Sequence, residues 1–422
     1  MKLYDHFESS TGVCTDTRKI EQDCLFFALK GGNFNGNDFI LDALKSGASH
    51  AVADEDREEF RSDSRISIVE DCLNSLQTLA THHRRQLKIP IIGITGSNGK
   101  TTTKELLHQA LLTKFRVFST PGNFNNHIGV PLSILMINSE HEIAILEYGD
   151  NHRGEVELLC KISEPTYCFL TNIGKDHIEG FGSFENNVLA KKELFDYAKV
   201  NGLSTYVDQN EPEVVELSQE LQHCITFPSE PKLKYHLEGA FIAFRYEGKS
   251  YASNLVGEYN HHNIDAAFYI SRNLGADAHL ALQAIADYIP KNNRSQLIEQ
   301  GDNVIYLDAY NANPSSMELA LKSFAKLELK TERVAIMGDM LELGPLSREE
   351  HQSILEYAKS LNLSRIILVG SEFSQVRISP EVEHFDRTES LKAYLKKNPI
   401  SNAQIMLKGS RGIKLESLLE VL

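Results

Sequence analysis

The alternation of apolar runs and polar segments divides the chain into three blocks. In the first block, the run CLFFAL at 24–29 predicts a strand and FILDALKSGA at 39–48 predicts a helix. The block ends in the polar stretch THHRRQLK at 81–88, which indicates a boundary before Pro90. We therefore predict a first domain over residues 1–86.

The second block has the rhythm of βαβ units. The run IPIIGIT at 89–95 predicts a buried strand, and the segment TKELLHQALLTK at 103–114 has the period of a helix. Two further runs, EIAILEY at 142–148 and PTYCFLTN at 165–172, predict strands that are each followed by a helical pattern. We predict a central domain, residues 87–292, with a P-loop-type and mainly parallel sheet.

Residues 233–256 alternate apolar and polar side chains around glycines, which predicts antiparallel hairpins beside that sheet. The third block, 293–422, repeats the βαβ rhythm with the runs NVIYLDA, RVAIMGD, RIILVG, VEHFD and AQIMLKG. It resembles a Rossmann-like domain, although it has no G-x-G-x-x-G fingerprint. The 422 residues divide into about three domains of roughly 150 residues, so the fold class is α/β with three domains.

Composition and charge narrow the function classes. Hydrophobic residues make up 41% and charged residues 24%, which is typical of a folded globular protein. The chain has 43 Lys and Arg against 58 Asp and Glu, a net charge of −15 that repels nucleic acid and anionic membranes. Any phosphate-bearing ligand must therefore be bound by local groups.

The cysteines and the apolar runs indicate a cytoplasmic enzyme. The six cysteines form no C-x-x-C pair, which favours reduced thiols and argues against a structural zinc site. The N-terminal segment lacks a basic region followed by an apolar run, and no apolar run approaches about 18 residues. We expect neither export nor membrane insertion.

The segment GSNGKTT has the composition of a phosphate-binding loop. It lies between a predicted strand and a predicted helix, where backbone N–H groups can surround phosphates. A standard G-x-x-x-x-G-K-[ST] loop has glycine where this chain has Ile94, and the upstream glycine is Gly93. A glycine-rich turn with an incidental lysine is the alternative, but the strand-loop-helix context favours ATP. The predicted ATP-binding residues are Gly96, Ser97, Asn98, Gly99, Lys100, Thr101 and Thr102.

Acidic and imidazole side chains follow two predicted strands. Glu147 falls at the end of one strand, and Asp176 and His177 follow the next. Ligands of open parallel sheets bind beyond the carboxyl ends of the strands, so these side chains should face the phosphate loop. Thr101 and Glu147 have oxygens suited to Mg²⁺, and His177 could complete a second cation site. Without the loop, Glu147 and His177 would be interpreted as surface or cap residues.

Several motifs in fixed order resemble the Mur ligases. They are GSNGKTT, TPGNFNNHIGVP at 120–131, EYG at 147–149, DH at 176–177 and GEYNHHN at 257–263. Four others are most similar to the dipeptide-adding branch of that family: DTR at 16–18, FFALKG at 26–31, DAYNANP at 308–314 and GDMLELG at 338–344. The resemblance covers almost the whole chain.

The resemblance implies an ATP-dependent amide ligase of bacterial peptidoglycan synthesis. The expected substrates are a UDP-N-acetylmuramoyl tripeptide and D-alanyl-D-alanine, joined through an acyl phosphate, and the expected cofactors are ATP and Mg²⁺. The expected form is a cytoplasmic monomer. Catalytic roles are implied for Lys100, His177 and Lys191. Lys191 matches a lysine that is carbamylated by CO₂ in the family. With His177 and Glu147, the carbamylated side chain would hold a second Mg²⁺. Without the resemblance, the residues would instead favour a solvated helical lysine.

The resemblance also implies ligand contacts. Asn260 and Asn263 match adenine-contacting asparagines, although by themselves they are equally good helix caps. Arg294 matches a hinge arginine that reaches nucleotide phosphates, and Asp308 is a further predicted ATP-binding residue. The implied substrate-binding residues, several of which could also belong to solvated turns or caps, are Thr15, Asp16, Arg18, Lys30, Gly31, Asn123, Asn125, Asn126, Asn311, Asn313, Lys408, Ser410 and Arg411.

Other functions remain open at this point. Another Mur-type amino-acid ligase and a folylpolyglutamate synthase-like ligase use the same chemistry, but the D-N-P-R motif of diaminopimelate-adding relatives is absent. A nucleotide-gated scaffold without turnover is the alternative from a different class. The presence of Lys100, Glu147, His177 and Lys191 argues against it.

Overall fold

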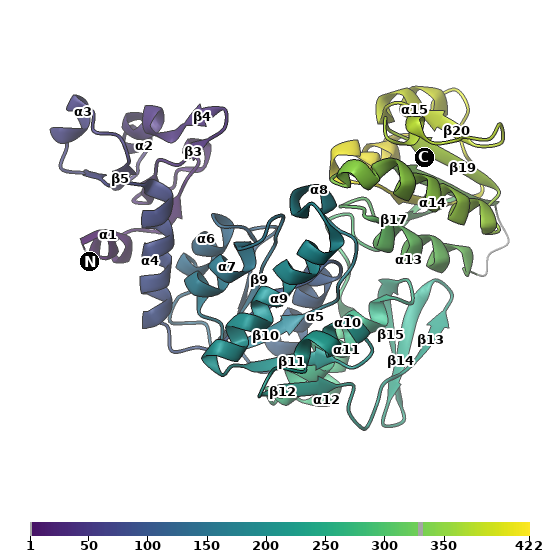
Figure 1. The fold of residues 1–422 in the computed structure, drawn as a ribbon, viewed down its shortest axis with the longest axis horizontal. Coiled ribbons are helices and arrows are strands. Elements are labelled where there is room, and N and C mark those ends of the chain that lie inside the picture. The colour runs from purple at the N-terminus through teal and green to yellow at the C-terminus, as the bar shows by residue number, and fades with distance from the viewer. Residues whose placement is uncertain (1, 328–331) are drawn as a thin grey trace.

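The computed structural model describes residues 2–327 and 332–422, and it has three units, each built on its own sheet (Figure 1). The first unit has a parallel sheet in the order β1-β2-β5-β6 and a short antiparallel pair, β3 and β4. Its elements are α1 (Lys2–Glu8), β1 (Val13–Cys14), β2 (Leu25–Phe27), β3 (Lys30–Gly31), β4 (Phe34–Asn35), α2 (Ile40–Lys45), β5 (His50–Ala53), α3 (Glu58–Arg61), β6 (Ile66–Ile68) and α4 (Cys72–Gln86).

The polar stretch at 81–88, which the sequence marked as a boundary, is largely helical, because residues 81–86 form the last turns of helix α4. This helix packs on α6 and α7 of the central unit. The Arg84 guanidinium donates to the backbone oxygens of Ser163 (2.8 Å) and Glu164 (3.0 Å). The polar residues of this stretch therefore connect two cores.

The first unit contains a histidine that is buried in its neutral form. His50 on β5 is 5% exposed, its Nε2 is 2.9 Å from Ser67 Oγ, and its ring stacks on His6. Burial, followed by the neighbouring His6, lowers the pKa of His50 to about 4.

We expect this unit to lose stability in mild acid. Because the unfolded chain binds a proton at His50 near pH 6.5, stability is complete above that pH and is lost as the pH falls toward 4. The loss attributable to His50 should be about 2–3 kcal/mol near pH 4.5. Thermal unfolding of wild type and His50→Gln between pH 7 and 4.5 measures it. Equal pH dependence of the two proteins would contradict the assignment.

The central unit has a six-stranded sheet in the order β12-β11-β10-β7-β9-β8, and each of its strand pairs is parallel. The sheet strands are β7 (Ile91–Thr95), β8 (Val117–Ser119), β9 (Ile143–Glu147), β10 (Tyr167–Leu170), β11 (Ser204–Asp208) and β12 (Cys224–Phe227). The connecting helices are α5 (Lys100–Leu112), α6 (Gly129–Leu135), α7 (Glu155–Ser163), α8 (Ile178–Phe181), α9 (Phe184–Asn201) and α10 (Pro212–Ser218). The buried strands β7 and β9 explain the continuous apolar runs.

The predicted hairpins form a three-stranded antiparallel sheet of β13 (Lys234–Glu238), β14 (Phe241–Tyr246) and β15 (Lys249–Val256). Helices α11 (Asn260–Asn273) and α12 (Ala278–Asp287) follow it. These two helices pack on α5, and their apolar side chains share one core with β14 and β15. The hairpins are therefore part of the central unit's second hydrophobic layer.

The third unit has a sheet in the order β16-β17-β21-β18-β19-β20, parallel except for the β16–β17 pair. Its elements are β16 (Gln296–Gln300), β17 (Asn303–Leu307), α13 (Pro314–Ala325), β18 (Glu332–Gly338), α14 (Ser347–Ser360), β19 (Arg365–Val369), β20 (Glu383–Phe385), α15 (Thr388–Leu395) and β21 (Ala403–Lys408). The five expected strands are present, and the antiparallel edge strand β16 was not predicted. The α/β class with a parallel central sheet and a Rossmann-like third unit is confirmed.

Candidate active site

A cavity of about 810 Å³ lies between the central and third units. Its walls include the loop between β7 and α5, the ends of β9 and β10, the start of α11 and the segment between β17 and α13. The predicted site residues that line it are Ser97, Asn98, Gly99, Lys100, Thr101, Thr102, Asn123, Asn125, Asn126, Glu147, His177, Asn260, Asn263, Arg294, Asp308, Asn311, Asn313 and Lys408.

Two glycines allow the phosphate-loop backbone to fold closely. Gly96 has φ +138°, and a Cβ there would lie 2.0 Å from Thr171 Oγ1. Gly99 has φ +79°, and a Cβ there would lie 2.4 Å from Asn263 Oδ1. Any other residue would be strained at both positions and would clash with a fixed neighbour. The loop conformation therefore depends on these two glycines.

The loop is held by the segment that follows β10. Asn98 N donates to Asn172 Oδ1 (2.9 Å), and Thr171 Oγ1 donates to Asn98 O (2.7 Å). Ser97 Oγ donates to the Asp176 carboxylate at 2.5 Å. These bonds fix the loop before any ligand binds, which reduces the entropy lost on binding.

Lys100 is the first residue of α5, and its Nζ donates to Gly96 O. Burial lowers the pKa of the Lys100 ammonium, and the carboxylates of Asp176, Asp150 and Glu147 oppose that effect. The ammonium is thus bound by its own loop in a position from which it can turn toward an anion.

Glu147 ends β9 and is buried. Its Oε1 accepts hydrogen bonds from Thr101 Oγ1 (3.2 Å) and Asn125 Nδ2 (2.9 Å). Its Oε2 is buried without a hydrogen-bond partner among the described residues, and the nearest cation is Lys104 Nζ at 3.9 Å. Lys104 is fully buried and donates to Thr120 O. Nothing in the sequence indicated this cation beside the Glu147 carboxylate.

Lys191 lies on α9 and has no exposed side-chain surface. Its Nζ is 2.8 Å from Asp150 Oδ2 and 3.4 Å from Asp176 Oδ2, and it lies over the ring of Phe181. Burial lowers the pKa of Lys191, but the two carboxylates outweigh it and the pKa is raised. Burial by itself would raise the pKa of Asp176, but the neighbouring cations Lys191 and Lys100 lower it to about 2. The solvated lysine that the sequence alone favoured is wrong.

The same region fits a divalent cation. Glu147, Asp150 and Asp176 each have one buried carboxylate oxygen that has no hydrogen-bond partner in the described chain: Oε2, Oδ1 and Oδ2. All three residues line the cavity. Hard carboxylate oxygens without donors are the ligands that Mg²⁺ prefers. Asp150 was not predicted from the sequence, because no motif distinguishes it from a turn aspartate.

His177 faces the third unit as well as the cavity. It has φ +50° and directly precedes α8, and its Nδ1 pairs with Glu342 Oε2. Burial is incomplete on both side chains, and His177 lowers the pKa of Glu342. This contact joins two units, which the sequence could not indicate because 165 residues separate the partners.

Asn260 and Asn263 lie in the first turn of α11, and both are buried. Asn260 Nδ2 donates to Val256 O, and Asn263 Nδ2 donates to Asn260 Oδ1 at 2.8 Å. Asn263 Oδ1 accepts from Thr103 Oγ1 at 3.0 Å. Neither residue is the N-cap, which is Tyr259, so the pair instead connects α11 with α5 and the phosphate loop.

Two arginines contact one aromatic ring in the third unit. The Arg294 guanidinium lies 3.7 Å from the centroid of the Tyr310 ring, and Arg411 lies 5.3 Å from it. Nearby, Lys408 Nζ forms an ion pair with Asp308 Oδ2 at 2.6 Å. Arg294 and Lys408 line the cavity and give this wall its positive groups, whereas Arg411 lies outside the lining.

Asn313 connects the third unit with the phosphate loop. Its side chain caps α13 by accepting from Ser316 N, and its Nδ2 donates to Asn98 Oδ1 at 2.9 Å. Ser410 Oγ accepts from Leu341 N and donates to Ala312 O, so it supports the same segment from behind. The cap of α13 and the contact with the phosphate loop are therefore made by one residue.

The predicted residues of the first unit lie outside the lining of this cavity. Arg18 pairs with Asp16 at 2.7 Å, and Lys30 pairs with Asp54 at 2.9 Å. Thr15 and Gly31 lie beside them in the chain. The structure therefore groups the implied nucleotide-sugar residues apart from the phosphate loop.

Comparison with known proteins identifies the family. The family model described as "Mur ligase family, catalytic domain" matches residues 9–84, "Mur ligase middle domain" matches 94–271, and "Mur ligase, glutamate ligase domain" matches 293–411. A curated relative from Bacillus subtilis (strain 168), named UDP-N-acetylmuramoyl-tripeptide--D-alanyl-D-alanine ligase, is 33% identical over 97% of this chain and 92% of its own length. The chain belongs to the Mur ligase family.

Solved structures of Mur ligases have the same architecture. MurF from Acinetobacter baumannii has a TM-score of 0.88 and 25% identity, with 99% of this chain and 97% of that chain covered. The MurF ligase of Thermotoga maritima in complex with ADP has a TM-score of 0.85 and 27% identity, with 98% and 97% covered. This Mur ligase therefore matches these relatives over nearly the whole chain. Among residues 2–327 and 332–422, none of the helices has the length and apolar character needed to cross a membrane.

Proposed function

We propose that this chain is an ATP-dependent ligase that joins D-alanyl-D-alanine to a UDP-N-acetylmuramoyl tripeptide in peptidoglycan precursor synthesis. The observation that carries the proposal is the cavity in which a phosphate loop, three buried carboxylates and a positive wall meet. The named function of the relative that is 33% identical supports the substrates, and the ADP complex of a similar structure supports the nucleotide.

The chemistry follows from the poor leaving group of a carboxylate. The γ-phosphoryl group of ATP passes to the terminal carboxylate of the tripeptide, which forms an acyl phosphate and releases ADP. The amine of D-alanyl-D-alanine then attacks the acyl carbon, the amide bond forms, a proton leaves the nitrogen and phosphate departs. The chain orients the reactants and neutralises the developing charge, with Lys100 on the phosphates and Arg294 at the opposite wall.

Mg²⁺ would be held by Glu147, Asp150 and Asp176 together with Thr101, and when bound it would neutralise phosphate charge. We also propose that Lys191 reacts as its neutral amine with CO₂, forming a carbamate and releasing a proton. The burial of Lys191 beside Asp150 and Asp176 supports this position, because a carbamate there would add a third anionic ligand once a divalent cation is bound. His177 would contribute to the same cation site.

The identity of the reaction product tests the proposed substrates. Protein, Mg-ATP, UDP-N-acetylmuramoyl tripeptide and D-alanyl-D-alanine should give ADP, phosphate and a UDP-linked pentapeptide, identified by mass spectrometry. Omitting the dipeptide is the control and should leave no new amide. Coupling of single amino acids to a UDP-muramoyl dipeptide, or of glutamate to a folate, would instead assign another ligase of this family.

We propose three domains, 1–86, 87–292 and 293–422, of which the third closes on the amino substrate while the first binds the UDP end. Lys175 and Glu350 support closure, because Nζ and Oε1 form an ion pair at 2.6 Å between the central and third units. The free cysteines support a reducing, cytoplasmic location, and a monomer remains our prediction.

The ion pair gives a test of closure. We expect Lys175→Glu to lower kcat/KM by about two- to tenfold, because like charges then oppose each other across the closing units. Combining Lys175→Glu with Glu350→Lys should restore most of it. Steady-state assays of the two single variants and the double variant measure the coupling. Additive effects without restoration would show that the contact does not form during turnover.

A further inference from the structure

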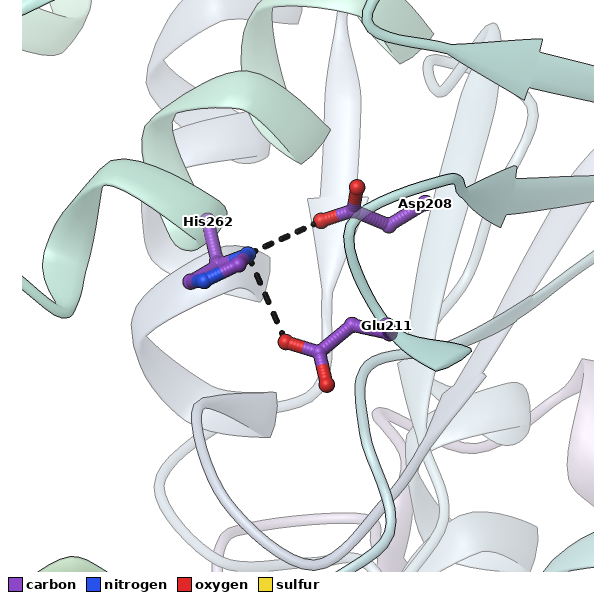
Figure 2. Close-up of side chains that lie close together, drawn as sticks. All are labelled: Asp208, Glu211 and His262. Atoms are coloured by element: carbon purple, nitrogen blue, oxygen red, sulfur yellow. Dashed lines mark hydrogen bonds and ion pairs between the residues drawn. The ribbon is translucent and has the colours of Figure 1, made fainter. Parts of the chain in front are cut away.

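Three potential metal ligands meet beside the cavity (Figure 2). Asp208 ends β11, Glu211 directly precedes α10, and His262 lies in the first turn of α11. His262 Nδ1 is 3.1 Å from Asp208 Oδ2 and 3.3 Å from Glu211 Oε1, and the three ligand atoms lie within 4.8 Å of one another. Figure 2 shows the three side chains pointing toward one place, Asp208 and Glu211 from the end of β11 and its connection to α10, and His262 from α11.

The two distances from His262 Nδ1 are compatible with a shared small ion as well as with the hydrogen bond to Asp208. A zinc ion bonded at about 2.0–2.2 Å to oxygen and nitrogen separates tetrahedral ligands by about 3.3–3.6 Å, close to these two distances. By contrast, a single proton on His262 Nδ1 lies between two carboxylates and can be donated fully to only one of them. An ion at this place would bond all three groups.

The negative charge around the three ligands also favours a bound cation. Asp208 is 1% exposed, and Asp265, one helical turn after His262, is 4% exposed. Three carboxyl groups therefore face one imidazole, which can supply at most a single positive charge.

Other neighbours do not balance this charge. Tyr235 donates a hydrogen bond to Asp265 at 2.7 Å but is neutral, and Glu213 adds a further negative group. The ring of His261 lies 3.9 Å from that of His262, and its Nδ1 is 2.7 Å from Glu258 O, outside the cluster. Lys232 acts on Asp265 but is exposed.

The cluster has an open side. Glu211 and His262 line the cavity, whereas Asp208 does not and lies behind them. An ion can therefore enter from the cavity, bind three protein ligands and keep one position for water. Three protein ligands with one exchangeable position is the coordination of accessible zinc sites.

We propose that Asp208, Glu211 and His262 form a binding site for a first-row divalent transition metal, with Zn²⁺ as the probe. One imidazole nitrogen with carboxylate oxygens suits Zn²⁺ better than Mg²⁺, which prefers oxygen ligands alone. The site is separate from the carboxylates of Glu147, Asp150 and Asp176. It depends on no step of the ligase reaction.

Zinc titration of the full chain tests the site. Chelator-treated protein is titrated with Zn²⁺ in excess Mg²⁺, followed by calorimetry and by elemental analysis after dialysis. Wild type should bind one equivalent that Asp208→Asn, Glu211→Gln and His262→Gln each bind at least about tenfold more weakly. His223→Gln, an exposed histidine of the same unit, should bind like wild type and is the matched control.

A second measurement excludes loss of fold as the cause. Zn²⁺ should raise the Tm of wild type and of His223→Gln, because a ligand that binds only the native state stabilises it. The near-isosteric Asp208→Asn and Glu211→Gln should unfold cooperatively without this rise. Identical zinc stoichiometry and affinity in wild type and all three ligand variants would overturn the proposal, as would the absence of zinc binding to wild type.

Discussion

Replacing Lys191 with alanine is expected to lower turnover by about 10²–10³-fold, while ATP affinity changes by less than about tenfold. The reason is position: the phosphate loop binds nucleotide, whereas Lys191 lies behind it against Asp150 and Asp176. In the uncarbamylated protein, removing the Lys191 ammonium leaves two buried carboxylates uncompensated, so the stability of that form should also fall by about 3–5 kcal/mol. Steady-state kinetics and thermal unfolding measure the two effects, and short carboxylates added to the assay should partly restore turnover.

Two further variants separate a carbamate from a structural cation. Lys191→Arg keeps a positive charge beside Asp150 and Asp176 but cannot form the carbamate, so it should be stable and nearly inactive. Lys192→Ala is the matched control, because Lys192 is the next residue on the same helix and pairs with Asp196 near the surface. An active Lys191→Arg enzyme, or the absence of a carbamate carbon signal in ¹³CO₂-treated wild type, would remove the carbamate from the mechanism.

Replacing Lys100 with methionine should lower kcat by about 10²–10³-fold with a smaller effect on folding. Methionine has nearly the same length and fills the same space, but it cannot neutralise the charge that develops on the transferring phosphoryl group. The interaction that is lost in the resting state is a hydrogen bond from Nζ to Gly96 O. Single-turnover formation of ADP and ligated product measures the chemical step directly.

The control for Lys100 is another lysine with the same kind of bond. Lys114 lies just after helix α5, and its Nζ donates to Gly275 O at 2.9 Å, away from the cavity. Lys114→Met should therefore keep wild-type turnover. If both variants lost activity equally, the effect of Lys100 would be a general loss of lysine-to-backbone contacts and not transition-state stabilisation.

The sequence predicted what depends on local pattern. The strands β7, β9 and β10 were evident because buried parallel strands are continuous apolar runs, and the loop from Gly96 to Lys100 was evident from its glycines. The helix α5 begins at Lys100, three residues earlier than its apolar period suggested, because the loop conformation and not the apolar pattern determines where it starts.

Contacts between distant segments could not be predicted. Asp150 has no motif of its own, and only the packing of α9 brings Lys191 to it. The edge strand β16 is short and half-buried, so its pattern lacks the apolar run of a central strand. The pairs His177–Glu342 and Asn98–Asn313 join two units, and their register depends on how those units pack.

Helix α4 connects the first unit to the central unit as one stiff element. Its 15 residues form a rod of about 22 Å that belongs to the core of the first unit and packs on α6 and α7 of the central unit. If the UDP end of the acceptor is held on the first unit, as proposed above, this rod would fix the distance that the acceptor must span to reach the cavity. A peptide one residue shorter would fall about 3.3–3.6 Å short of that distance. On the proposed function, the length of the acceptor would therefore be constrained by the fold in addition to any contact with its side chains.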